Sequence, residues 1–213
     1  MSTTELIPKL VLVGFFLLVG FPVHEFAHAF AAYRLGDGTA KLFGRLTLNP
    51  AAHFDPLGAF MLIVSAFAGG GLIIGWAKPT PVNPSNLRDR RNGEVVVALA
   101  GPLSNLAMAV VGALIFRALP FDAQIPPEAF YLLIFFVMFN VGLAVFNLIP
   151  VPPLDGSTLL FRFVSPMTAW RLRPVLAQWG LLILLGIVIF GGPILGRIMG
   201  AVINVLLGQS VFG

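Results

Sequence analysis

Hydrophobic residues are grouped along the chain in long runs, which short polar segments separate. Apart from the less regular residues 56–75, four runs have at least about 17 residues, the length that a helix needs to cross the ~30 Å hydrocarbon layer of a bilayer. They are residues 6–33, 95–118, 129–149 and 174–190. This pattern predicts four membrane-spanning helices.

Two further apolar runs are less regular. Residues 56–75 contain Gly69-Gly70-Gly71 near their middle, so either a complete span or a re-entrant hairpin folded at the glycines is open. Residues 191–193, Gly-Gly-Pro, predict a turn that leads into a last, shorter helix over residues 194–207. In total we expect five to six transmembrane or re-entrant helical segments.

The region between the first two spans has a different pattern. Residues 41–48 (KLFGRLTL) alternate between apolar and polar after a Gly-Asp-Gly turn, which predicts a short strand. Residues 76–84 (WAKPTPVNP) are interrupted by prolines and are expected to be extended. The expected fold class is therefore all-α polytopic membrane protein, with a short β-rich stretch in this region.

Composition agrees with a membrane location. The chain has 213 residues, 58% of them hydrophobic, only 10% charged, and a mean hydropathy of +0.94. Its net charge of +4 is spread over short loops and forms no basic groove, which excludes a nucleic-acid partner. No polar segment is long enough to fold as a soluble module, so residues 1–213 are expected to form one domain.

Three polar residues interrupt the first apolar run near its end: His24, Glu25 and His28. On a helix, His24 and His28 are one turn apart and project from the same face, so both imidazoles can bind one zinc ion at about 2.0–2.1 Å. Glu25 is placed to take a proton from a metal-bound water. A cleavable signal peptide is rejected for this run, because cleavage at Ala27-His28-Ala29 would cut the motif.

Zinc with two histidines needs a third protein ligand, and with no cysteine in the chain this must be a histidine or a carboxylate. Asp155 is the main candidate, because it follows the proline-broken end of the third span, where a carboxylate is costly unless it has a function. The alternative for Asp155 is a helix cap. His53 is the rival ligand, although its polar surroundings favour a role in structuring its loop.

Three motifs, HEFAH, AGPLSN and NLIPVPPLDG, occur in this order within apolar segments. They resemble the site-2 protease family of intramembrane zinc metalloproteases, over roughly residues 15–163. The resemblance implies one Zn²⁺ per chain held by His24, His28 and Asp155, with Glu25 as the catalytic base. It also implies that Asn147 steadies the substrate carbonyl; the alternative for Asn147 is a bond to nearby helix backbone.

The chain departs from the family pattern in having no PDZ or CBS-like module and in carrying the extra apolar residues 56–75. The resemblance nevertheless predicts an enzyme, a zinc metalloendopeptidase that cuts a peptide bond within or next to a transmembrane helix. Its partners would be the lipid bilayer and a single-pass or other transmembrane protein as substrate. Residues 76–83 are a candidate edge for the unwound substrate, or a plain surface linker.

A membrane metal-binding protein or metal transporter without proteolytic activity is the alternative function. A transporter would need polar residues on facing spans along a path, and a non-catalytic protein would be expected to lack one member of the motif. Here the polar residues gather at one place and the set is complete: His24, Glu25, His28 and Asp155. Proteolysis is therefore favoured.

The basic residues predict the orientation of the chain. If residues 56–75 form a re-entrant hairpin, ten of the 13 basic residues share one face and only Lys9, Arg117 and Arg197 lie on the other. That division of basic residues fits the positive-inside rule better than the division that a complete span would give. We expect a multi-pass protein of the cell membrane, with the active site near the cytoplasmic face.

Overall fold

The computed structural model describes residues 10–11, 13–68, 75–119 and 126–208. Its regular structure is helical, and no described residue lies in a strand. Four helical stretches are long and apolar enough to cross a membrane: Val13–Arg34, Arg90–Ala118, Ala129–Asn147 and Pro166–Leu207. The chain divides into two compact units, Met1–Gly93 and Glu94–Gly213, which are taken in turn.

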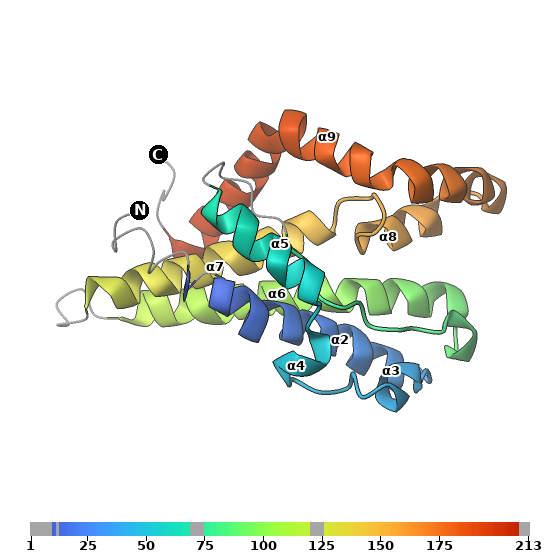
Figure 1. Ribbon diagram of the computed structural model, residues 1–213, viewed down its shortest axis with the longest axis horizontal. Coiled ribbons are helices and arrows are strands. Elements are labelled where there is room, and N and C mark those ends of the chain that lie inside the picture. Colours follow the sequence, from blue (N-terminus) through green and yellow to red (C-terminus); the bar gives the residue numbers. More distant parts are fainter. Residues whose placement is uncertain (1–9, 12, 69–74, 120–125, 209–213) are drawn as a thin grey trace. The chain divides into compact units, whose positions relative to one another are not determined.

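The first unit is built around α2 (Phe21–Arg34). A single π-helical turn, η1 (Phe16–Gly20), leads into it, and the backbone N–H of Phe21 bonds the Phe16 carbonyl. Pro22 has no N–H to continue the regular i→i−4 bonding at this point, so the wider turn falls directly before it. The short helices α3 (Thr39–Leu42) and α4 (Pro50–His53) pack against α2 (Figure 1).

The predicted β-rich stretch is wrong. Lys41 and Leu42 end α3, and Gly44 then turns the chain with a φ of 68°. The backbone groups here are satisfied locally rather than by a neighbouring strand: Arg45 N donates to Ala40 O at 2.8 Å. The alternation instead marks Arg45 as a buried residue, and its guanidinium donates to the carbonyls of Ala52 and Lys78.

Helix α5 (Pro56–Phe67) covers the first part of the irregular apolar run. With 12 residues it is about 18 Å long, too short to cross a bilayer. Asp55 caps it by accepting a bond from Gly58 N at 2.8 Å. The fold predicted at Gly69–Gly71 lies outside the described residues.

Residues 75–83, here called the return segment, run back beside α5. A Cβ on Gly58 would lie 2.1 Å from the Trp76 carbonyl oxygen, and one on Gly75 would lie 2.7 Å from Leu62 Cβ. Near the start of α5, Lys78 N of the return segment donates to His53 O at 2.9 Å. The start of α5 and the end of its return therefore lie together, as in a hairpin.

The second unit contains α6 (Arg90–Ala118, whose first turn belongs to the first unit), α7 (Pro127–Asn147), α8 (Gly156–Phe163) and α9 (Pro166–Leu207). Figure 1 shows α6 and α7 side by side. Gly112 permits this, because a Cβ there would lie 2.7 Å from Phe136 Cδ1. The core of the unit is formed by Ala109, Ala113, Val137, Val141, Ile203 and Leu207.

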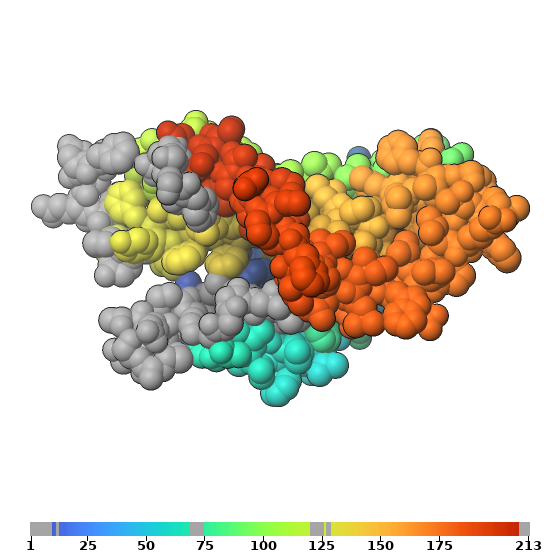
Figure 2. All heavy atoms as spheres, turned by 90° about the horizontal axis from the view of Figure 1, so that it is seen from above, coloured from blue at the N-terminus to red at the C-terminus, as the bar shows by residue number. Residues whose placement is uncertain are grey.

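Helix α9 corrects a second expectation. The turn predicted at residues 191–193 does not form, and one helix of 42 residues continues through Pro174 and Pro193. In apolar surroundings a broken helix would leave several backbone groups without partners, whereas an internal proline forfeits a single bond. Figure 2 shows α9 as a continuous band, orange to red, across the face in view.

Candidate metal centre

Helix α2 brings the two predicted histidine ligands together. The Nε2 atoms of His24 and His28 lie 3.0 Å apart, and their rings meet edge to face with centroids 4.6 Å apart. Two nitrogens that share a tetrahedral zinc at 2.0–2.1 Å are separated by about 3.3 Å. Both side chains are buried, at 5% and 7% exposure, so the pair suits a zinc ion and is shielded from bulk water.

Glu25 is held by the return segment. Its Oε2 accepts bonds from the backbone N–H of Thr80 at 2.8 Å and from the Thr80 hydroxyl at 2.7 Å. Thr80 was not singled out from the sequence, where the only signal is its place between two prolines in an otherwise apolar context. The first unit thus supplies the two histidines, the carboxylate and the residue that holds the carboxylate.

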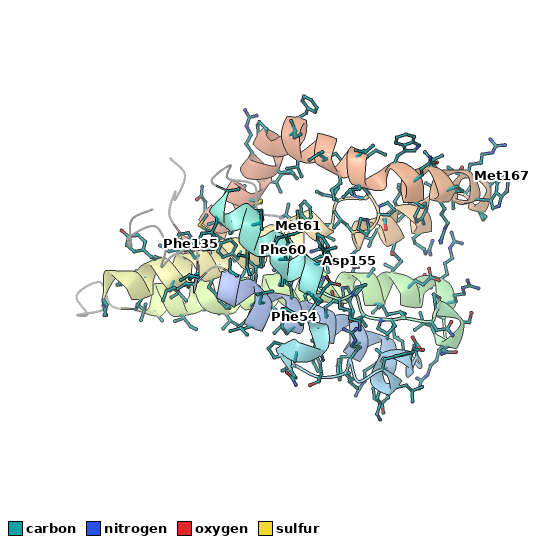
Figure 3. All side chains as sticks on the ribbon, in the orientation of Figure 1. Phe54, Phe60, Met61, Phe135, Asp155 and Met167 are labelled. Atoms are coloured by element: carbon teal, nitrogen blue, oxygen red, sulfur yellow. The ribbon has the colours of Figure 1, made fainter. Side chains whose placement is uncertain are left out.

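The second unit brings Asn147 and Asp155 to one turn, between α7 and α8. Gly156 allows the turn, because a Cβ there would lie 2.2 Å from the Leu148 carbonyl oxygen. Asp155, labelled in Figure 3, stands at the N-cap position of α8, but its side chain makes no capping bond. The capping alternative for Asp155 is therefore not realised.

Asn147 ends α7, and its Nδ2 donates to Leu143 O at 2.9 Å. This is the backbone contact that the sequence left open as the alternative for Asn147. The second hydrogen on Nδ2 of Asn147 and its oxygen Oδ1 take no part in this bond. The role of Asn147 toward a substrate stays a prediction.

His53 lies at the end of α4, where it organises its own loop. Its side chain is 2% exposed, Nε2 donates to Thr47 O at 2.8 Å, and its carbonyl accepts from Lys78 N. These contacts fit the loop-structuring role that its polar surroundings indicated, and they tie α4 to the return segment.

An acidic residue outside the motif, Asp37, organises the end of α2. It is fully buried and accepts from Thr39 N at 3.0 Å, Asn83 N at 2.7 Å and Asn86 Nδ2 at 2.9 Å, as well as from the Thr39 hydroxyl. Burial by itself would raise the pKa of Asp37, but the bonds from Thr39, Asn86 and Asn83 together hold it below its usual value. Asp37 is therefore ionised and anchors the end of α2, a role that no sequence pattern indicated.

These features define a class: a helical membrane protein with a buried histidine pair and an adjoining carboxylate on one helix. Comparison with known proteins supplies the family. The sequence model of Peptidase family M50 matches residues 123–190, which include Asn147 and Asp155. No solved structure matches the chain.

Two curated proteins match over most of their length. The chain is 39% identical over 167 residues to "Putative zinc metalloprotease YwhC" of Bacillus subtilis (strain 168), an alignment that covers 76% of this chain and 72% of that protein. It is 36% identical over 200 residues to "Putative zinc metalloprotease Rip2" of Mycolicibacterium smegmatis, covering 91% and 74%. The chain belongs to peptidase family M50, and it is accordingly a zinc metallopeptidase of the intramembrane type.

Proposed function

We propose that the chain hydrolyses a peptide bond within or next to a transmembrane helix of a membrane-protein substrate. The observation that carries the proposal is the 3.0 Å convergence of His24 and His28 beside Glu25 on a helix long and apolar enough to span a membrane. Arg34 follows His28 by six residues, about 9 Å along the helix, and this spacing supports a position of the pair within the apolar layer and close to one face.

We further propose that His24, His28 and Asp155 hold the zinc ion, and that Asn147 contacts the substrate carbonyl. Zinc, when bound, acidifies a water molecule and polarises the scissile carbonyl. Glu25 accepts the proton of the attacking water and passes it to the amine of the departing peptide, so one water is consumed for each bond cut. A helical substrate must first unwind locally, because its peptide groups are engaged in i→i−4 bonds.

The orientation is part of the proposal. A hairpin over residues 56–75 puts its two flanking loops on one face, and the length of α5 and its contacts with the return segment support that arrangement. The excess of basic residues on this face supports a cytoplasmic location for it. The active site would open near the cytoplasmic face of the cell membrane.

The test compares the wild-type protein with Glu25→Gln on a model transmembrane peptide in detergent or liposomes. Glutamine keeps the shape of the side chain but cannot take the proton, so zinc content should stay at one per chain while cleavage falls by about 10²-fold or more. Near-normal cleavage by Glu25→Gln would contradict the assignment of the base. A wild-type protein that binds zinc but cuts no transmembrane peptide would favour a transport or binding role.

A further inference from the structure

Hydrogen bonds from three residues of the return segment attach it to the rest of the first unit. Lys78 N bonds the carbonyl of His53, Thr80 bonds Glu25, and Asn83 N bonds the carboxylate of Asp37. The outer two attachments are to groups with no part in the proposed chemistry. The middle one ends on the proposed catalytic base.

Thr80 offers Glu25 two donors. Its N–H lies 2.8 Å and its hydroxyl oxygen 2.7 Å from Oε2, while the hydroxyl is also 3.0 Å from the Glu25 carbonyl oxygen. A hydroxyl has one hydrogen, and the charged carboxylate is the stronger acceptor of the two. Oε2 is therefore occupied from two directions, whereas no bond to Oε1 is found among the described residues.

The sequence around Thr80 makes this contact rigid. Pro79 fixes its own φ, and Pro81 restricts Thr80 to extended backbone. Neither proline has an N–H, so Thr80 carries the backbone donor of residues 79–81 that can bond Oε2 of Glu25. The side chain of Glu25 has several rotatable bonds. It is therefore held by a residue, Thr80, whose backbone has little conformational freedom.

We propose that Thr80 is a positioning residue for Glu25: it fixes Oε2 and so leaves Oε1 as the oxygen that handles the proton. This inference rests on the proposed role of Glu25 as base. General-base catalysis depends on the base lying within hydrogen-bond reach of the proton that it takes. A carboxylate free to rotate would spend only part of its time in that geometry.

The test is Thr80→Val, which keeps the backbone N–H and the shape but removes the hydroxyl. A bond to a charged group is lost, so kcat for a transmembrane peptide should fall by about ten- to a hundredfold. The KM and the zinc content should stay unchanged, because the hydrogen bonds of Thr80 in the described structure all go to Glu25 and, in this proposal, Thr80 does not bind the substrate. Thr80→Ser restores the hydroxyl and should recover most of the kcat.

Ser85→Ala is the matched control, since Ser85 is an exposed hydroxyl residue that follows the return segment, and it should leave kcat unchanged. If Thr80→Val fails to fold, Thr80→Ala replaces it, because alanine also deletes the hydroxyl and adds no bulk. Normal kcat in the hydroxyl-deleted variant, or an unchanged defect in Thr80→Ser, overturns the positioning role. These outcomes stay distinct from a failure of the proposed function, which would show as an active Glu25→Gln protein.

Discussion

At the scale of residues, the close approach of His24 and His28 limits what can lie between their two side chains. With their Nε2 atoms 3.0 Å apart, two bare lone pairs would repel, so a shared proton or a shared cation must lie between them. A zinc ion satisfies both nitrogens at once, in agreement with the family to which the chain belongs.

The third ligand can be tested by metal content. Asp155→Ala should lose bound zinc and activity together, because two histidines alone hold the ion weakly. His53→Ala is the paired variant: its Nε2 already bonds Thr47 O, so it should keep most of its zinc. Both variants are measured by metal analysis of purified protein. Stoichiometric zinc in Asp155→Ala would remove Asp155 from the site.

At the scale of elements, side chains rather than a sheet hold together the described residues between α2 and α6. Arg45 and Asp37 are both buried. Between them they bond the backbone of α4 and of the return segment, and the side chain of Asn86 in η2 (Pro84–Asn86). In the extended return segment, the N–H groups of Lys78, Thr80 and Asn83 bond His53, Glu25 and Asp37. Pro79 and Pro81 have no N–H and the N–H of Thr80 is engaged, so a substrate strand pairing with residues 79–81 would rely on their carbonyl groups.

Asp37 predicts a dependence of stability on pH. Its pKa in the folded protein is below the usual 3.8, so its stabilising effect is complete above that value and is lost as the pH falls through the folded pKa. Asp37→Asn should lower the free energy of unfolding by about 1.5–3 kcal/mol at neutral pH. The difference between wild type and variant, followed by thermal unfolding in detergent, should shrink below about pH 4. A difference that stays constant down to pH 3 would contradict this.

At the scale of the whole molecule, the decisive question is how many times the chain crosses the bilayer. Four helical stretches in the described residues are long enough, and α5 is too short. The proposed hairpin would leave Arg88, Arg90 and Arg91 on the same side of the membrane as the end of α2.

Cysteine labelling in intact cells tests this orientation, and the chain has no native cysteine to interfere. Asn92→Cys, in the first turn of α6, should react with a membrane-impermeant reagent only after the cells are permeabilised. Ala118→Cys, at the opposite end of the same helix, should react from outside in intact cells. Labelling of Asn92→Cys from outside would rule out the hairpin arrangement.

The sequence by itself determined the long apolar helices and the class of chemistry, because both depend on local patterns. Apolar runs long enough to cross a bilayer predicted α2, α6, α7 and most of α9, and the spacing of His24 and His28 fixed their shared face. The family also followed from the sequence, because three ordered motifs carried it. The candidate ligand Asp155 was identified in the same way and awaits its test.

Only the tertiary structure decided what depends on contacts between distant residues. Residues 41–48 have the alternation of a strand, but the described part of the chain offers them no partner strand, so Arg45 turns inward and the backbone bonds locally. Residues 191–193 have the composition of a turn, yet the packing of Ile203 and Leu207 and the cost of a broken helix in apolar surroundings keep α9 continuous. The contact of Thr80 with Glu25 joins residues 55 positions apart, a separation at which local pattern carries no information.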